Sequence, residues 1–170
     1  KWDVPHTLAC VFWMKELLKY EKGNPKILVP TIYLHDIGGA DLFYVSHNTH
    51  GSQEELKSEQ MKRSKEISAK ILNEVGGFSE DETNKILYLV GVHDDYDEIT
   101  SSEDGQLVFE ADGLGQIDRG RVKPTFSKED SLKFLAYFEK ERAPRYKTES
   151  GKKFLNQLLL EAYKYCEEEM

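Results

Sequence analysis

Four residues of the types that bind metal ions interrupt apolar segments of this sequence: His6, His35, Asp36 and Asp112. His35 and Asp36 are adjacent, at the end of the most apolar segment of the chain. A buried ionised carboxylate is costly unless it is paired or bound to a metal. Two imidazoles and two carboxylates suit a divalent ion with open water positions, whereas a structural zinc site more often uses thiolates. The residue types therefore indicate a divalent-metal site.

Helical spacing places these residues on buried faces of the elements that must position them. In segment 6–21, His6 shares one face with Cys10, Trp13 and Leu17, and Gly23 is a stop signal. The apolar run 27–37 fits a buried helix or a buried strand by periodicity alone. Prolines within and before it disfavour a central strand, so we predict a buried helix that ends at Gly38-Gly39.

The rest of the chain also reads as helices separated by short connectors. Asp112 lies on a small-residue face with Val108, Ala111 and Gly115, within a predicted helix 103–117. Capping boxes of the type Ser-x-x-Glu open helices at 52–75 and 79–93, and an acidic loop is predicted at 94–98. Two more helices are predicted over 127–142 and 148–168, with connectors at 40–51 and 119–125. The prediction is one compact all-α domain over 1–170, with the C-terminal helices 127–170 packing on a motif core at about 3–118.

Composition and charge exclude some classes of protein. The chain has 170 residues with a formal net charge of −8, and a general nucleic-acid binder would show a basic face instead. No apolar run approaches the ~18–20 residues of a membrane span, and no signal-like segment opens the sequence. Cys10 and Cys166 form no metal-binding motif; a disulfide between them is an option, but two free thiols in a reducing cytosol are expected. We therefore expect a cytoplasmic protein that does not associate with membranes.

The order His6 … His35-Asp36 … Asp112 resembles the HD-domain superfamily of metal-dependent phosphohydrolases. The flanking residues fit as well: Asp-x-x-His opens the first helix, and the second motif reads Leu-His-Asp-Ile-Gly over 34–38. The last motif, Glu-Ala-Asp-Gly-Leu over 110–114, is similar to the usual Asp-Ala-Asp-x-Leu of the family. Two further stretches are similar, 68–72 after the usual position of a third histidine and 146–148 before the final helix.

The resemblance implies a metal-activated water that attacks a phosphate ester of a small molecule, nucleotides included. Many members carry a histidine in the middle helix, where this sequence has Ser64, and dinuclear members use that histidine with a later one that His93 would match. We therefore predict one ion, of Mn, Fe, Co, Ni, Mg or Zn, held by His6, His35, Asp36 and Asp112. Asp36 would also orient the water, and His93 would contact the phosphate or protonate the leaving oxygen.

Other polar residues have weaker functional interpretations beside an ordinary structural one. Lys62, Arg63 and Lys65 could bind the phosphate, or form a solvated helix face. His93 could instead be a helix-end histidine favoured by the helix dipole. Less specific candidates are Asp41 and Asp94 as water-activating carboxylates, and His47 and His50 in a lid. Trp2, Trp13, Phe43 and Tyr44 could form a stacking surface, but core or rim positions are expected for them.

Two other functions stay open from the sequence. A non-enzymatic HD module would bind metal or nucleotide as a sensor or scaffold, and the missing middle histidine favours it. An oxygenase with two iron ions is disfavoured by that same missing histidine. Metal-dependent hydrolysis of a generic phosphate ester separates the first two possibilities.

Overall fold

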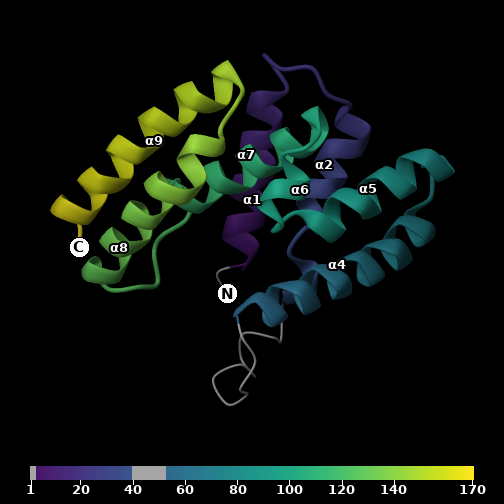
Figure 1. The fold of residues 1–170 in the computed structure, drawn as a ribbon, viewed down its shortest axis with the longest axis horizontal. Coiled ribbons are helices and arrows are strands. Elements are labelled where there is room, and N and C mark those ends of the chain that lie inside the picture. The colour runs from purple at the N-terminus through teal and green to yellow at the C-terminus, as the bar shows by residue number, and fades with distance from the viewer. Residues whose placement is uncertain (1–2, 40–52) are drawn as a thin grey trace. The chain divides into compact units, whose positions relative to one another are not determined.

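The computed structural model describes residues 3–39 and 53–170, and all regular elements in these ranges are helical (Figure 1). The all-α prediction is therefore confirmed. No helix in the described ranges is long and apolar enough to cross a membrane. The chain folds into two compact units, which we call the terminal unit (Lys1–Gly23 with Glu110–Met170) and the middle unit (Asn24–Phe109).

The terminal unit joins the two ends of the sequence. Its elements are α1 (Asp3–Leu17), the second half of α7 (Glu103–Ile117), α8 (Lys128–Tyr137), the π-helical η3 (Phe138–Arg142), the 3-10 helix η4 (Ala143–Arg145) and α9 (Glu149–Glu168). Ser127 and Thr148 cap α8 and α9 by accepting hydrogen bonds from backbone N–H groups, as N-caps commonly do. Trp13 of α1 packs against Phe154 of α9, with ring centroids 5.1 Å apart.

The middle unit contains α2 (Pro25–Leu34), the 3-10 helix η1 (Ile37–Gly39), α4 (Gln53–Val75), α5 (Glu80–Val92), α6 (Tyr96–Ile99) and the first half of α7. The Ser79–Glu82 capping box is present, and Gly76 and Gly77 end α4 with φ values of +68° and +81°. Helix α5 packs on α2 and α4. Their shared core consists of Leu34, Leu72, Ile86 and Val90.

Some predicted helices end earlier in the structure, α1 at Leu17 and α2 at Leu34, where a 3-10 turn follows. Two other predicted elements differ in kind from the structure. The predicted acidic loop 94–98 contains a one-turn helix, α6, which Asp95 begins by accepting a hydrogen bond from the Glu98 N–H. The predicted helix 127–142 is α-helical only to Tyr137 and continues as the π-helical η3. A single turn and a change of helical register have no clear periodic signal, which explains both errors.

The turn after the His35-Asp36 pair packs tightly against α4. A β-carbon on Gly38 of η1 would lie 2.4 Å from the Ser64 backbone nitrogen and 2.5 Å from the Gln60 carbonyl oxygen. Only glycine fits this contact, so the short motif His-Asp-Ile-Gly is held directly on the backbone of α4.

Gly38→Ala should therefore destabilise the protein, because overpacking against rigid backbone typically costs about 1–3 kcal/mol. Gly91→Ala is the matched control, since its added methyl group would meet only the flexible Lys65 side chain, at 3.2 Å. Thermal unfolding should give a clearly lower Tm for Gly38→Ala than for Gly91→Ala. Equal melting temperatures would contradict the close packing of η1 on α4.

Candidate metal centre

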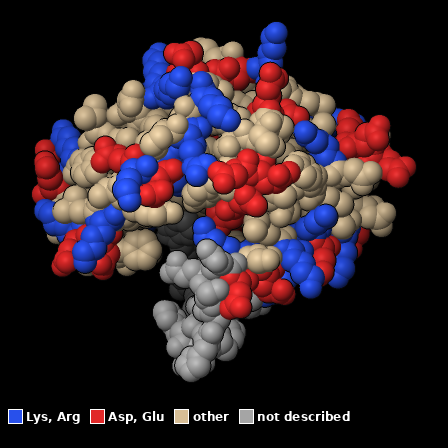
Figure 2. Space-filling view, in the orientation of Figure 1, with Lys and Arg blue, Asp and Glu red and all other residues tan. Residues whose placement is uncertain are grey.

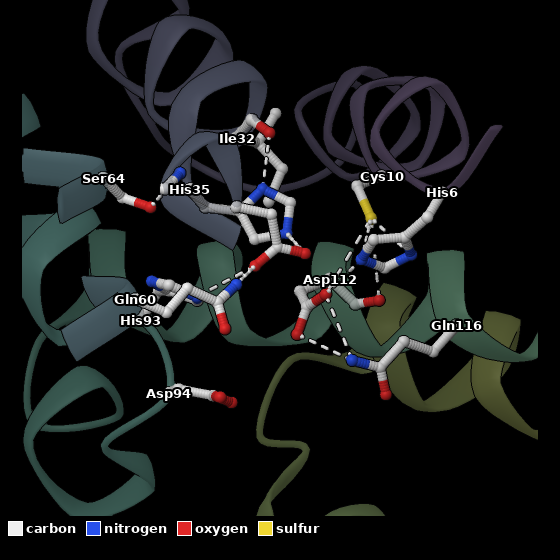
Figure 3. A network of polar contacts seen from close by, with 12 residues as sticks. His6, Cys10, Ile32, His35, Gln60, Ser64, His93, Asp94, Asp112 and Gln116 are labelled. Carbon is white, nitrogen blue, oxygen red and sulfur yellow. Dashed lines mark hydrogen bonds and ion pairs between the residues drawn. The ribbon is translucent and has the colours of Figure 1, made fainter. Parts of the chain in front are cut away.

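In the terminal unit, the fold brings two of the predicted ligands together. His6 of α1 is fully buried, and Asp112 of α7 is 4% exposed. The His6 Nε2 atom lies 3.1 Å from Asp112 Oδ1 (Figure 3). A β-carbon on Gly115 would overlap Cys10 of α1, at 2.4 Å from its Sγ, so the small-residue face of α7 is what lets α1 approach this closely.

The second oxygen of Asp112 is held by a residue that the sequence analysis did not identify. Arg142 is 2% exposed, and its Nη2 donates to Asp112 Oδ2 over 2.9 Å. Its Nη1 donates to Gln116 Oε1 at 2.9 Å, and Gln116 Nε2 lies 3.3–3.4 Å from the Asp112 oxygens. The two oxygens of Asp112 therefore face different partners, Oδ1 the imidazole of His6 and Oδ2 the guanidinium of Arg142.

Cys10 is fully buried beside His6, one helical turn further along α1. Its Sγ lies 3.5 Å from both ring nitrogens of His6. Because Sγ is equally far from both ring nitrogens, it does not lie along the lone pair of either one. An ion about 2.1 Å from one nitrogen, along its lone pair, would therefore be farther from Sγ than the usual zinc–sulfur distance of about 2.3 Å. Cys10 and His6 would therefore share an ion only after one of the two side chains rotates, and the thiol lies 3.8 Å from the Asp112 carbonyl oxygen.

Glu110, two residues before Asp112, has a structural role in the terminal unit. Its fully buried carboxylate accepts hydrogen bonds from the backbone N–H groups of Lys147 and Thr148, at 2.8 and 3.0 Å, and from the Thr148 hydroxyl. Burial raises the pKa of Tyr146 well above its usual value, so its phenol stays neutral and donates to the Glu110 carbonyl oxygen. The segment before α9 is thus anchored beside the Asp112 motif.

In the middle unit, two histidines face the Asp36 carboxylate. His35 Nε2 lies 3.3 Å from Asp36 Oδ2, and His93 Nε2 lies 3.3 Å from Asp36 Oδ1. In both rings Nδ1 is 2.8 Å from a backbone carbonyl oxygen, that of Ile32 or Val90. Because a carbonyl oxygen only accepts, each Nδ1 carries a proton and each Nε2 is the atom left for binding a metal. Both rings are buried, so their orientation is fixed by the fold.

Two residues of α4 complete the surroundings of Asp36. Gln60 Nε2 donates to Asp36 Oδ1 over 2.8 Å. Ser64 accepts a hydrogen bond from the Gly38 N–H at 2.9 Å. The hydroxyl of Ser64 therefore supports the turn that follows Asp36, while the sequence analysis gave no role to Gln60.

The other charged candidates have ordinary partners or exposed positions. Asp94 forms an ion pair with Lys57, at 3.3 Å. Lys62 and Lys65 are exposed and line a hollow of about 290 Å³ between α4 and α5, and Arg63 is half-buried. On the described part of the face in Figure 2, basic side chains are mixed with acidic ones. The remaining candidates lie outside the described residues: Trp2, Asp41, Phe43, Tyr44, His47 and His50.

Buried groups of the described chain could thus hold a metal ion: His6, Cys10 and Asp112 in the terminal unit, and His35 in the middle unit. No family model, curated protein or solved structure matches the chain. The resemblance to HD phosphohydrolases therefore rests on the motif residues themselves, and the function has to be argued from the chemistry of these clusters.

Arg142→Met should destabilise the metal-stripped protein strongly, because removing one partner of a buried ion pair typically costs ~3–5 kcal/mol. Adding Mn²⁺ should stabilise this variant more than it stabilises the wild type, since a bound cation would then compensate the Asp112 carboxylate. Denaturant unfolding with chelator and with Mn²⁺ measures both effects.

Arg119→Met is the control for this experiment. Arg119 is also buried, but it donates to the backbone carbonyl oxygen of Gln116 rather than to a carboxylate. Its response to Mn²⁺ should equal that of the wild type. An equal response of Arg142→Met and wild type would contradict the expectation that a metal ion compensates the Asp112 carboxylate when Arg142 is removed.

Proposed function

We propose that this chain is a metal-dependent phosphohydrolase that holds one divalent ion through His6, His35, Asp36 and Asp112. One observation carries the proposal. Each aspartate directs one oxygen at an imidazole Nε2, Asp112 Oδ1 at His6 and Asp36 Oδ2 at His35, while donors hold the other oxygen. Imidazole nitrogens and carboxylate oxygens are common ligands of divalent cations, and here one of each lies side by side in both pairs.

The residues fit such an ion chemically. His35 keeps Nδ1 on the Ile32 carbonyl oxygen, which is the usual outer partner that orients a metal-binding histidine. Asp112 is oriented by Arg142 in the same way, through the oxygen that the ion would not need. Mn, Fe, Co, Ni, Mg and Zn are all compatible with two imidazoles and two carboxylates.

The catalytic roles follow from these positions. When bound, the ion would lower the pKa of a water molecule and polarise a phosphoryl oxygen. Asp36 would both ligate and orient the attacking water. His93 has a fixed ring and an Nε2 beside Asp36 Oδ1, so it is placed to contact the phosphate or to give a proton to the leaving oxygen. The motif order supports a small phosphorylated substrate, nucleotides included.

A second candidate is a metal- or nucleotide-binding module without catalytic activity. The observation in its favour is Ser64, whose hydroxyl is used by the Gly38 N–H, so α4 offers no imidazole at this position. Metal binding without hydrolysis of any phosphate ester would support this candidate.

The proposal is tested by assaying phosphate release from nucleotides and sugar phosphates after metal removal and addition of Mn²⁺, Co²⁺, Ni²⁺, Mg²⁺ or Fe²⁺. We expect turnover that depends on the metal and is lost in His6→Ala and Asp112→Ala. Activity that survives chelation, or that these variants retain, would contradict the proposal.

His35→Ala and His93→Ala should differ in their effects. His35→Ala should lose the metal and melt at a lower temperature, because it leaves an incomplete ligand set beside a half-buried carboxylate. His93→Ala should keep the metal and most of its stability but lose turnover, since general acid-base groups typically contribute ~10²–10⁴-fold. Metal content, Tm and phosphate release should be measured on both variants.

Two outcomes would contradict this division of roles. Loss of the metal in His93→Ala as complete as in His35→Ala would make His93 a ligand. Full activity of His93→Ala on every accepted substrate would leave His93 as an ordinary histidine at the end of α5.

A further inference from the structure

Gln60 of α4 is 6% exposed and donates its side-chain N–H to Asp36 Oδ1, the oxygen that His93 also faces. We propose that Gln60 limits the centre to a single ion, because its NH₂ group occupies the Asp36 oxygen beside His93 and supplies no third ligand for a second ion. This inference rests on the proposed function, because it assumes that a first ion binds at Asp36.

The two oxygens of Asp36 have different surroundings. Oδ2 lies 3.3 Å from His35 Nε2, on the side of the proposed ion. Oδ1 lies 3.3 Å from His93 Nε2 and 2.8 Å from Gln60 Nε2. Oδ1 and His93 would therefore supply an oxygen and a nitrogen ligand to a second ion. Whether a second ion binds then depends on the third neighbour, Gln60.

That third neighbour is a hydrogen-bond donor. A carboxylate only accepts, so the amide of Gln60 presents its NH₂ group to Asp36, and an amide NH₂ has no lone pair available for a metal. Its partial positive charge also repels a cation at this oxygen. Ser64, one turn further along α4, is engaged by the Gly38 N–H. Neither residue provides a third ligand.

Replacing the Gln60 amide with a carboxylate of the same shape would put a metal ligand where the wild type has a hydrogen-bond donor. Gln60→Glu would place a carboxylate beside Asp36 Oδ1 and His93 Nε2, giving two oxygen ligands and one nitrogen ligand. Two adjacent carboxylates repel each other unless a cation binds between them. We expect the variant to bind two equivalents of Mn²⁺, against one for the wild type.

Three further variants make the comparison specific. Gln60→Met removes the donor without adding a ligand and should stay at one equivalent. Gln60→Glu combined with His93→Ala should return to one equivalent. Gln60→His offers an imidazole instead of a carboxylate, and it serves as the second test if Gln60→Glu does not fold, as judged by circular dichroism.

The measurement is native mass spectrometry of each chain after equilibration with Mn²⁺ and buffer exchange. One ion in the wild type and two in Gln60→Glu or Gln60→His support the inference. One ion in all of them overturns it and leaves the proposed function standing. Two ions in the wild type also overturn it, because Gln60 then excludes nothing, and none in the wild type overturns both the inference and the proposed function.

Discussion

Burying a carboxylate is unfavourable by several kcal/mol unless donors or cations surround it, and the terminal unit buries three of them between positions 110 and 118. Each carboxylate takes its partners from a different part of the sequence. Glu110 accepts from backbone N–H groups before α9, Asp112 from Arg142 of η3, and Asp118 from the indole of Trp13 in α1. These interactions, together with the apolar core, tie both ends of the chain to α7.

The same constraint explains the candidate centre. Asp36 and Asp112 both have partners within the protein. One oxygen of Asp36 accepts from the Gln60 amide, and one oxygen of Asp112 accepts from Arg142. The other oxygen of each aspartate lies beside an imidazole. The donors fix the orientation of each carboxylate before any ion binds. An ion would then meet ligands whose geometry is already determined, which reduces the cost of ordering them.

Much of the fold and part of the site could be predicted from the sequence. The spacing of His6 and the small residues around Asp112 place both on buried helix faces, as the structure has them. The sequence analysis missed Arg142 and Gln60 because both lie in charged or polar segments. In the sequence alone, a buried polar residue in such a segment cannot be told from a solvent-exposed one. A signal was present, since Arg142 continues the buried series Ser131, Leu135 and Phe138, and Gln60 the series Ser64, Ser68 and Leu72. Their partners are distant in sequence, so only the fold reveals them.

We propose that Asp36 and Asp112 bind the same divalent ion. Titration of the metal-stripped chain with Mn²⁺ tests it most directly, in the wild type, in Asp36→Asn, in Asp112→Asn and in the control Asp94→Asn. Asparagine keeps the shape of each side chain but removes its charge. The account predicts one equivalent bound by the wild type and by Asp94→Asn, and much weaker binding by each of the other two. Wild-type binding by either Asp36→Asn or Asp112→Asn would contradict it.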